Sequence, residues 1–245
     1  MEVKEGVYLL EDVPGIYVEK LDAVVVADLH LGYEESMAKQ GVFLPRLQLR
    51  KALKHISKAQ RVTGAKRLII DGDLKHEFSK LLKSEKLESA KLISTAFQLG
   101  FREIILVRGN HDNYIKPIIE SLGGEVVEDL EDGDILLTHG HKKAETDAEV
   151  IIIGHEHPSI SVSIGGAKAR FPVFLIAPLR SGSIVVVLPA LGAYQTGNPV
   201  SLDWESYLSP IMREKVETGE IVPVIFDEKE GLMPLPKLSV LQSIV

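Results

Sequence analysis

The chain has 245 residues, 45% of them hydrophobic and 26% charged, with a formal net charge of −7 and a pI near 5.7. This composition is that of a soluble globular protein, and the length is enough to bury a substantial core. The acidic balance argues against a long electrostatic grip on duplex nucleic acid, and zero cysteines exclude disulfides and thiolate metal sites.

Segments that would direct the chain to a membrane are not found in the sequence. No apolar run reaches the roughly 18 residues that a membrane-spanning helix needs. The first residues, Met-Glu-Val-Lys-Glu-Gly, lack the apolar core of a signal peptide. We therefore expect a cytoplasmic protein without a membrane partner.

The first half of the chain alternates apolar runs with helical patterns. Strands that alternate with helices predict a parallel sheet with crossover helices. In order, we expect a hairpin at 7–10 and 16–18, a strand at 23–27, helices at 34–39 and 46–62, a strand at 67–70, a polar loop at 74–84, a helix at 86–99, a strand at 104–107 and a helix at 114–122.

The second half has shorter apolar runs separated by glycine or proline turns. Such runs favour antiparallel pairing. We expect strands at 125–127, 134–137, 149–153, 160–164, 170–176 and 183–188, then one helix at 204–215 and a last strand at 221–226. No linker, repeat or low-complexity tract divides the sequence. We therefore expect a single domain over residues 1–245, without a separate capping domain.

Polar side chains follow five of the apolar runs, where each strand should end. Open α/β folds place their chemistry at this carboxyl edge of the sheet. Alone, Asp-x-His and Gly-Asp are more simply explained as a turn, a helix cap or a surface histidine, whereas a His-x-His pair on a loop binds metal about as often as not. Together they contain six of the eight histidines and favour a metal site. The motifs are Asp28-Leu29-His30, Gly72-Asp73, Gly109-Asn110-His111-Asp112, His139-Gly140-His141 and Gly154-His155-Glu156-His157.

The ligand types indicate which metals such a site would bind. Carboxylates, imidazoles and an amide oxygen, without sulfur, suit Mn²⁺, Fe or Zn²⁺ better than Ca²⁺ or copper. The ligands are too many for one ion. Two ions about 3.5–4 Å apart can clamp the attacking and leaving oxygens of an in-line displacement and acidify a water. The motifs therefore predict hydrolysis of phosphoesters.

The complete, ordered motif series resembles the calcineurin-like metallophosphoesterases. The resemblance implies an α/β fold in which two mixed parallel and antiparallel sheets are sandwiched between helices. It also implies two divalent ions, most often Mn²⁺, with Fe, Zn or Ni as alternatives. The first ion would be bound by Asp28, His30, Asp73 and His157, and Asp73 would bridge to a second ion completed by Asn110, His139 and His155. His111 would stabilise the transition state and protonate the leaving oxygen, held in place by Asp112.

Four stretches, 27–34, 41–50, 154–158 and 188–194, are similar to a narrower subgroup. It comprises the small archaeal and bacterial phosphoesterases whose bacterial branch is the ligase-associated DNA damage response endonuclease. This similarity implies a phosphodiesterase acting on nucleotides or single-stranded nucleic acid, with nuclease activity as one form. A phosphomonoesterase or nucleotide pyrophosphatase with the same centre is the alternative. A non-catalytic scaffold is disfavoured because the ligand set is complete.

Three further histidines have separate interpretations. His141 is expected in the outer shell, where it would orient a ligand. His76 is expected on a solvated loop, and touching substrate is its alternative role. His55 is expected on the exposed side of its helix.

Overall fold

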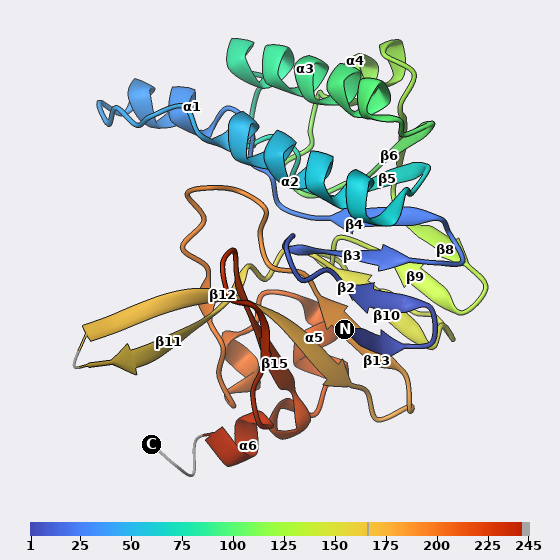
Figure 1. Cartoon of the computed structure of the whole chain (residues 1–245), viewed down its shortest axis with the longest axis vertical. Coiled ribbons are helices and arrows are strands. Elements are labelled where there is room, and N and C mark those ends of the chain that lie inside the picture. The colour runs from blue at the N-terminus through green and yellow to red at the C-terminus, as the bar shows by residue number, and fades with distance from the viewer. Residues whose placement is uncertain (166, 242–245) are drawn as a thin grey trace.

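The structure is a computed structural model that describes residues 1–165 and 167–241, arranged in four layers (Figure 1). Residues 166 and 242–245, which belong to the expected domain, lie outside this description. Helices cover one sheet, a second sheet packs on its other face, and short helices cover the outer side of the second sheet. This arrangement confirms the predicted sandwich of two mixed sheets flanked by helices.

The first sheet has its strands side by side in chain order. Its first four strands pair antiparallel, and the fourth to seventh pair parallel. Helices in the parallel connections all lie on one face (Figure 1). The strands are β1 (Glu2–Lys4), β2 (Val7–Leu9), β3 (Gly15–Val18), β4 (Ala23–Val26), β5 (Arg67–Asp71), β6 (Glu103–Val107) and β7 (Glu125–Val127), and the helices are α1 (Tyr33–Lys39), α2 (Gln48–Thr63), α3 (Lys83–Leu99) and α4 (Lys116–Ser121). The predicted crossover sheet is confirmed.

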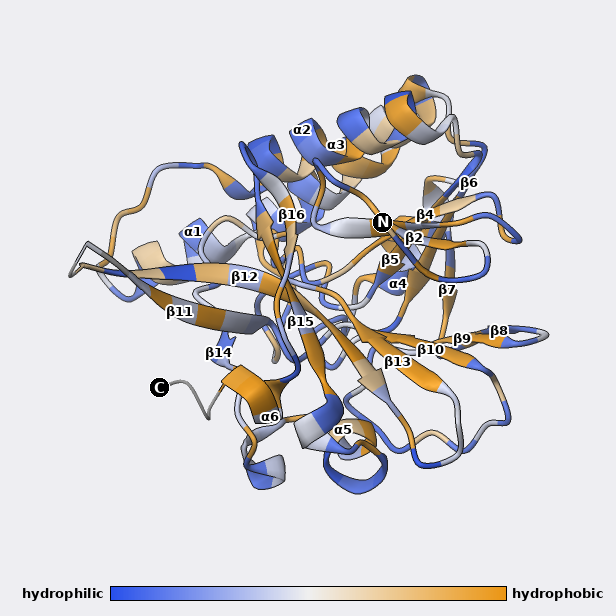
Figure 2. Cartoon of the chain, turned by 60° about the horizontal axis from the view of Figure 1, so that its bottom comes forward, coloured by the Kyte–Doolittle hydropathy of each residue, from blue (hydrophilic) through white to orange (hydrophobic). Residues whose placement is uncertain are grey.

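Strand β4 shows why this sheet is buried on both faces. Val24 and Val26 pack against the helices, whereas Ala23 and Val25 pack against the second sheet. A strand covered on both sides needs a continuous apolar run. In Figure 2 hydrophobic colour accordingly fills the central strands, and hydrophilic colour marks much of α2.

The second sheet has the order β14-β11-β12-β13-β10-β9-β8, and β15 pairs with β12 and β16. Antiparallel pairing is confirmed for β11–β12 and β12–β13. It is wrong for β10, which pairs parallel with both β9 and β13. The strands are β8 (Leu130–Asp132), β9 (Ile135–Leu137), β10 (Val150–Ile153), β11 (Pro158–Ile164), β12 (Ala167–Pro178), β13 (Ile184–Val187), β14 (Asn198–Pro199), β15 (Val222–Asp227) and β16 (Gly231–Pro234).

Parallel pairing here has a physical reason. β9 and β10 are separated by residues 138–149, and β10 and β13 by the β11–β12 hairpin, so the chain returns to the same end of the sheet each time. The apolar runs of β10 and β13 are almost entirely buried, as in other parallel strands. Because most turns in this half of the sequence are short, the sequence does not distinguish these parallel strands from the antiparallel ones.

The end of the chain differs from the prediction. The expected helix at 204–215 is split into η1 (Trp204–Ser206) and α5 (Pro210–Lys215), because Ser209 caps α5 and Pro210 opens it. The strand at 221–226 is β15 but not the last, since β16 and α6 (Leu238–Leu241) follow; η2 (Thr218–Glu220) precedes it. Within the described residues, no helix has the length and apolar character needed to cross a membrane.

Candidate metal centre

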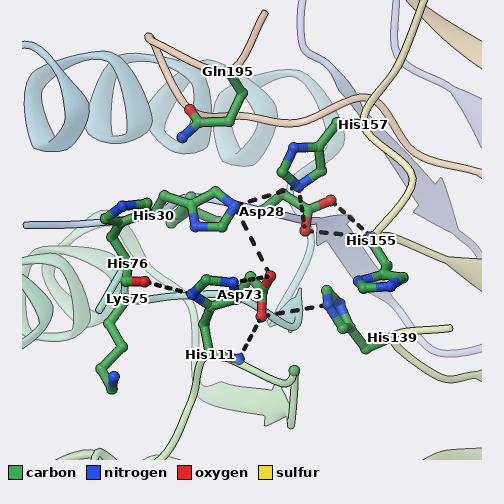
Figure 3. A network of polar contacts seen from close by, with 12 residues as sticks. Asp28, His30, Asp73, Lys75, His76, His111, His139, His155, His157 and Gln195 are labelled. Atoms are coloured by element: carbon green, nitrogen blue, oxygen red, sulfur yellow. Dashed lines mark hydrogen bonds and ion pairs between the residues drawn. The ribbon is translucent and has the colours of Figure 1, made fainter. Parts of the chain in front are cut away.

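The expected ligands lie where the carboxyl ends of strands from both sheets meet (Figure 3). Strands β4, β5 and β6 of the first sheet lead into Asp28, Asp73 and Asn110. Strands β9 and β10 of the second sheet lead into His139 and His155. The site is therefore built at the junction of the sheets, and its geometry depends on how they pack.

The backbone at these strand ends adopts an unusual conformation. Among the described residues, seven other than glycine have positive φ, and five of them are expected ligands. Non-glycine residues rarely adopt positive φ, and such strain gathers at functional sites. The five are Asp28 (φ 58), His30 (φ 48), Asp73 (φ 49), His155 (φ 65) and His157 (φ 44).

Two glycines of the motifs are needed for close packing around these side chains. A Cβ on Gly72, where φ is +77, would overlap the His139 ring. A Cβ on Gly109 would overlap the Asp73 carboxylate and its backbone nitrogen. The glycines that precede Asp73 and Asn110 therefore let residues from neighbouring strands converge on one point.

The first group of side chains comprises Asp28, His30, Asp73 and His157, whose ligand atoms all lie within 4.8 Å of one another. His157 Nε2 is 3.1 Å from Asp28 Oδ1 and 3.3 Å from His30 Nε2. The Asp28 carboxylate also accepts a hydrogen bond of 3.0 Å from the backbone N–H of His155. The structure thus brings together the four residues expected at the first ion; their role as ligands stays a prediction.

The second group comprises Asp73, His139 and His155, again with ligand atoms within 4.8 Å of one another. His139 Nδ1 donates a hydrogen bond of 2.9 Å to the carbonyl of Asp71, so its Nε2 points toward Asp73 Oδ1, 3.4 Å away. Asp73 belongs to both groups. That is the placement a carboxylate bridging two ions requires.

The donor atoms fit a metal on their chemistry. His139 Nε2 and Asn110 Oδ1 are buried and have no hydrogen-bond partner among the described residues. Buried polar atoms are normally hydrogen-bonded, so each such atom needs an explanation. An imidazole nitrogen and an amide oxygen are ligands that a divalent transition-metal ion accepts.

Electrostatics around Asp73 favour a positive charge. Burial would raise the pKa of Asp73, but the neighbouring histidines His139, His30 and His111 together outweigh burial and lower it. Burial would lower the pKa of His139, but Asp73 raises it to about 10. Burial lowers the pKa of His30 to about 3 and that of His155 to about 4, which keeps both imidazoles neutral. His30 and His155 are thus already neutral, the form that binds metal, whereas His139 would release its proton on binding a metal.

His111 lies at the same edge but is held differently from the prediction. Its Nδ1 donates to the backbone carbonyl of His76, and its Nε2 lies 4.0 Å from Asp73 Oδ2. The Asp112 carboxylate instead accepts backbone N–H groups of Gly109 at 2.9 Å and Lys75 at 3.4 Å. Asp112 therefore shapes the loop, and the expectation that it holds the His111 ring is wrong.

His76 lies closer to the candidate site than the preferred interpretation of the sequence placed it. It is half-buried, and its ring centroid is 5.4 Å from that of His30 and 5.8 Å from that of His111. The ligand atoms of these three histidines form a third group within 4.8 Å. The prediction of a solvated loop is wrong because His76 N–H bonds the Leu31 carbonyl at 3.0 Å, which continues the strand pairing beyond Asp73. The position three residues after Asp73 was the signal available.

The two remaining histidines differ in their surroundings. The His141 ring lies 5.4 Å from that of His139, and its Nδ1 is buried without a hydrogen-bond partner in the described chain. Its outer-shell role stays a prediction. His55 is 1% exposed, so its expected surface position is wrong. Phe226 of β15 and Glu228, just after that strand, cover that side of α2.

Comparison with known proteins identifies the family. Residues 21–174 match the calcineurin-like phosphoesterase superfamily domain, which is well over half of the chain. The chain therefore belongs to the calcineurin-like phosphoesterase superfamily, as the ordered motifs predicted. Members of this family usually bind divalent metals, in agreement with the Asp and His groups described above.

Two solved structures are similar to this chain. Pseudomonas putida nuclease MPE is 20% identical, with a TM-score of 0.65 over 94% of each chain. The E. coli phosphoesterase YfcE is 18% identical, with a TM-score of 0.42 over 69% of this chain and 79% of its own. At these identities the likeness concerns the fold alone, and of the two the first supports it. No curated protein matches the sequence.

Proposed function

We propose that the protein is a phosphodiesterase that depends on two divalent metal ions, with Mn²⁺ as the preferred metal. The observation that carries this proposal is the central carboxylate of Asp73, which is shared by two groups of ligand atoms. We assign Asp28, His30, Asp73 and His157 to one ion and Asp73, Asn110, His139 and His155 to the other, with His141 in the outer shell. When bound, such a pair of ions activates a water and neutralises charge on the phosphoryl group.

The side chain of His111 supplies the proton in this proposal. Its Nδ1 is fixed by the His76 carbonyl, and its Nε2 faces Asp73 across 4.0 Å. A carbonyl that accepts from Nδ1 holds the ring with Nε2 toward the metal edge, and in the imidazolium form Nε2 carries a second proton. There Nε2 can protonate the leaving oxygen. Asp112 acts indirectly, through the loop that carries His111.

Two features favour diesters over monoesters: the nearest lysine points away from the ligand groups, and a cavity lies beside them. A monoester carries an additional negative charge that a site must neutralise. Lys75, next to His76, turns its ammonium to the carbonyls of Glu77 and Lys80 and away from the ligand groups (Figure 3). A cavity bordered by His157 leaves room for the second substituent of a diester.

Single-stranded nucleic acid is the diester class that the surrounding side chains suit. Tyr33 lies 4.7 Å from His76 between ring centroids and stacks on Tyr194 at 5.5 Å. Phe78 is 55% exposed, and its ring centroid lies 5.9 Å from that of His111. Unpaired bases stack on such aromatic faces without sequence preference.

Both sheets share one apolar layer, so we propose that they act as one domain. We also propose that no capping domain covers the metal edge.

The test combines metal removal with a pair of matched aryl esters. Chelator should abolish hydrolysis of bis(4-nitrophenyl) phosphate, and Mn²⁺ should restore it. The value of kcat/KM for this diester should exceed that for 4-nitrophenyl phosphate. Full activity in protein shown to be metal-free would refute the two-metal site. A preference for the monoester would identify a phosphomonoesterase with the same centre.

A further inference from the structure

A cavity of about 280 Å³ lies beside the first group of ligands and plays no part in the metal centre itself. His157 forms one wall, so the cavity and the metal edge share a side chain. The other walls come from the start of β11, the middle of β12, the loop at 190–197 and Lys51 of α2. The fold brings the β11–β12 hairpin together here with the loop at 190–197 and with α2, which are distant from it or from each other in the sequence.

Two hydrogen bonds connect Arg170 to the backbone of His157 through residues 197 and 198. Its Nη1 lies 3.4 Å from the Gly197 carbonyl and donates to it. The next residue, Asn198, donates its backbone N–H to the His157 carbonyl at 2.7 Å. Gly197 has a φ of +76, and a Cβ there would lie 2.6 Å from the same His157 carbonyl. The guanidinium is therefore held against the loop that abuts a candidate metal ligand.

The charge of Arg170 is available for a ligand. Within the described residues, Arg170 forms no ion pair, whereas Lys51 lies 3.7 Å from Glu228 Oε1. A guanidinium has five N–H donors in a planar fork that matches phosphate oxygens. One hydrogen bond to a carbonyl leaves the others for an anion. Arg170 is thus the cavity's unpaired cation.

The remaining walls suit the uncharged part of a nucleotide. Pro158, Pro172 and Ala190 present apolar surface. Gln195 adds a carboxamide, which Gln48 fixes by donating to its Oε1 at 3.2 Å, and Figure 3 shows Gln195 above His30 and His157. The volume is at the lower limit for small-ligand pockets, which gives room for one sugar-phosphate unit and not for a duplex.

We propose that this cavity binds a second phosphate of the substrate, one nucleotide away from the scissile phosphate, and that Arg170 holds it. The inference rests on the proposed phosphodiesterase function. It defines the substrate as a chain with at least two phosphates, in contrast to an isolated diester. Arg170 is then a residue for specificity, and the chemical step does not involve it.

The kinetic test uses three thymidine dinucleotides with Mn²⁺. TpT has only the scissile diester, whereas pTpT and TpTp add a phosphate at the 5′ or the 3′ end. For the wild type, the kcat/KM of either pTpT or TpTp should exceed that of TpT by about tenfold. This is the gain that one charge-assisted hydrogen bond to the added phosphate would give. Arg170→Ala should remove this gain, so that its kcat/KM values for TpT, pTpT and TpTp become equal.

The matched control is Lys168→Ala. Lys168 lies two residues along the same strand, is exposed, and does not line the cavity. This variant loses the same charge and should keep the gain. Equal rates for all three dinucleotides, or a gain that survives in Arg170→Ala, would overturn the inference.

Binding measured by calorimetry separates this inference from the proposed function. Thymidine 3′,5′-bisphosphate should bind the wild type about tenfold more tightly than thymidine 5′-monophosphate. Arg170→Ala should bind both alike. If the wild type fails to hydrolyse bis(4-nitrophenyl) phosphate, the proposed function fails. The bisphosphate comparison still decides whether the cavity binds a second phosphate.

Discussion

Asp73 and His139 come from different sheets, yet Asp73 Oδ1 and His139 Nε2 are only 3.4 Å apart. Asp73 follows β5 of the first sheet, and His139 follows β9 of the second. The shared apolar layer between the sheets therefore sets this distance. The geometry of this candidate site therefore depends on how the two sheets pack together.

Substitutions at Asp73 and at His111 should have different effects, because the first residue is assigned to metal binding and the second to proton transfer. Asp73→Ala removes a side chain common to both ligand groups, so the variant should lose bound metal as well as rate. His111→Ala should keep its metal content. Its kcat should fall by roughly 10²–10⁴-fold, the usual contribution of a general acid. Metal content is measured by elemental analysis after gel filtration.

The leaving group provides the control for His111. Nitrophenolate hardly needs a proton, so the loss of rate in His111→Ala should be smaller for an aryl ester than for a dinucleotide. An equal loss for both substrates would contradict the role as acid. So would a His111→Ala protein that had lost its metal.

The part of this site that sequence alone predicts is local. Each motif directly follows its own strand, so the strand ends could be located from Asp28, Asp73 and Asn110 without knowing the pairing. The parallel arrangement of β9, β10 and β13 could not, because it depends on how long connections return across the sheet. The positions of His76 beside His30 and of Arg170 beside Gly197 could not be predicted for the same reason, because these neighbours are distant in the sequence.

Gly109→Ala should damage the metal site through steric overlap alone. The new Cβ would occupy the position of the Asp73 carboxylate, so that side chain must move away from both ligand groups. We expect a marked loss of metal affinity, measured by titration calorimetry with Mn²⁺. Gly219→Ala is the control, because its Cβ would meet Ser239 at 3.5 Å, an ordinary contact. Unchanged Mn²⁺ affinity in Gly109→Ala would show that Asp73 is not confined as the structure indicates.

Lys75→Met should loosen the loop that positions His111. The Lys75 side chain is fully buried, and its ammonium donates to the backbone carbonyls of Glu77 and Lys80. Methionine fills similar space but leaves those carbonyls without their donor, at a cost of roughly 1–3 kcal/mol. Because the His76 carbonyl holds His111, kcat should fall while metal content stays intact.

Lys80→Met is the matched control for this loop, since the Lys80 side chain is exposed. Both stability, from urea unfolding, and kcat should stay close to the wild-type values in this variant. A Lys75→Met protein with normal kcat would show that the position of His76 does not depend on the buried ammonium.

Buried His55 should make the metal-free protein sensitive to acid. Burial lowers the pKa of His55 to about 4, although Glu228 Oε1 lies 3.3 Å from its Nε2. In the unfolded chain its pKa is about 6.5. Between these values the unfolded state binds more protons, so the free energy of unfolding falls as the pH falls from about 6.5 toward 4. At pH 4.5 the loss from this residue should be on the order of 2 kcal/mol.

His55→Gln should remove that part of the acid sensitivity, because glutamine does not titrate. Urea unfolding of the wild type and the variant in chelator, at pH 7 and pH 4.5, measures the change in each protein. Histidines of the metal edge with lowered pKa are present in both proteins, so their contribution cancels in the comparison. The drop between the two pH values should be smaller in the variant by about 2 kcal/mol. An equal drop in both proteins would mean that His55 accepts its proton in the folded state at no cost, and that the covering segment at Phe226 and Glu228 does not shield it from water.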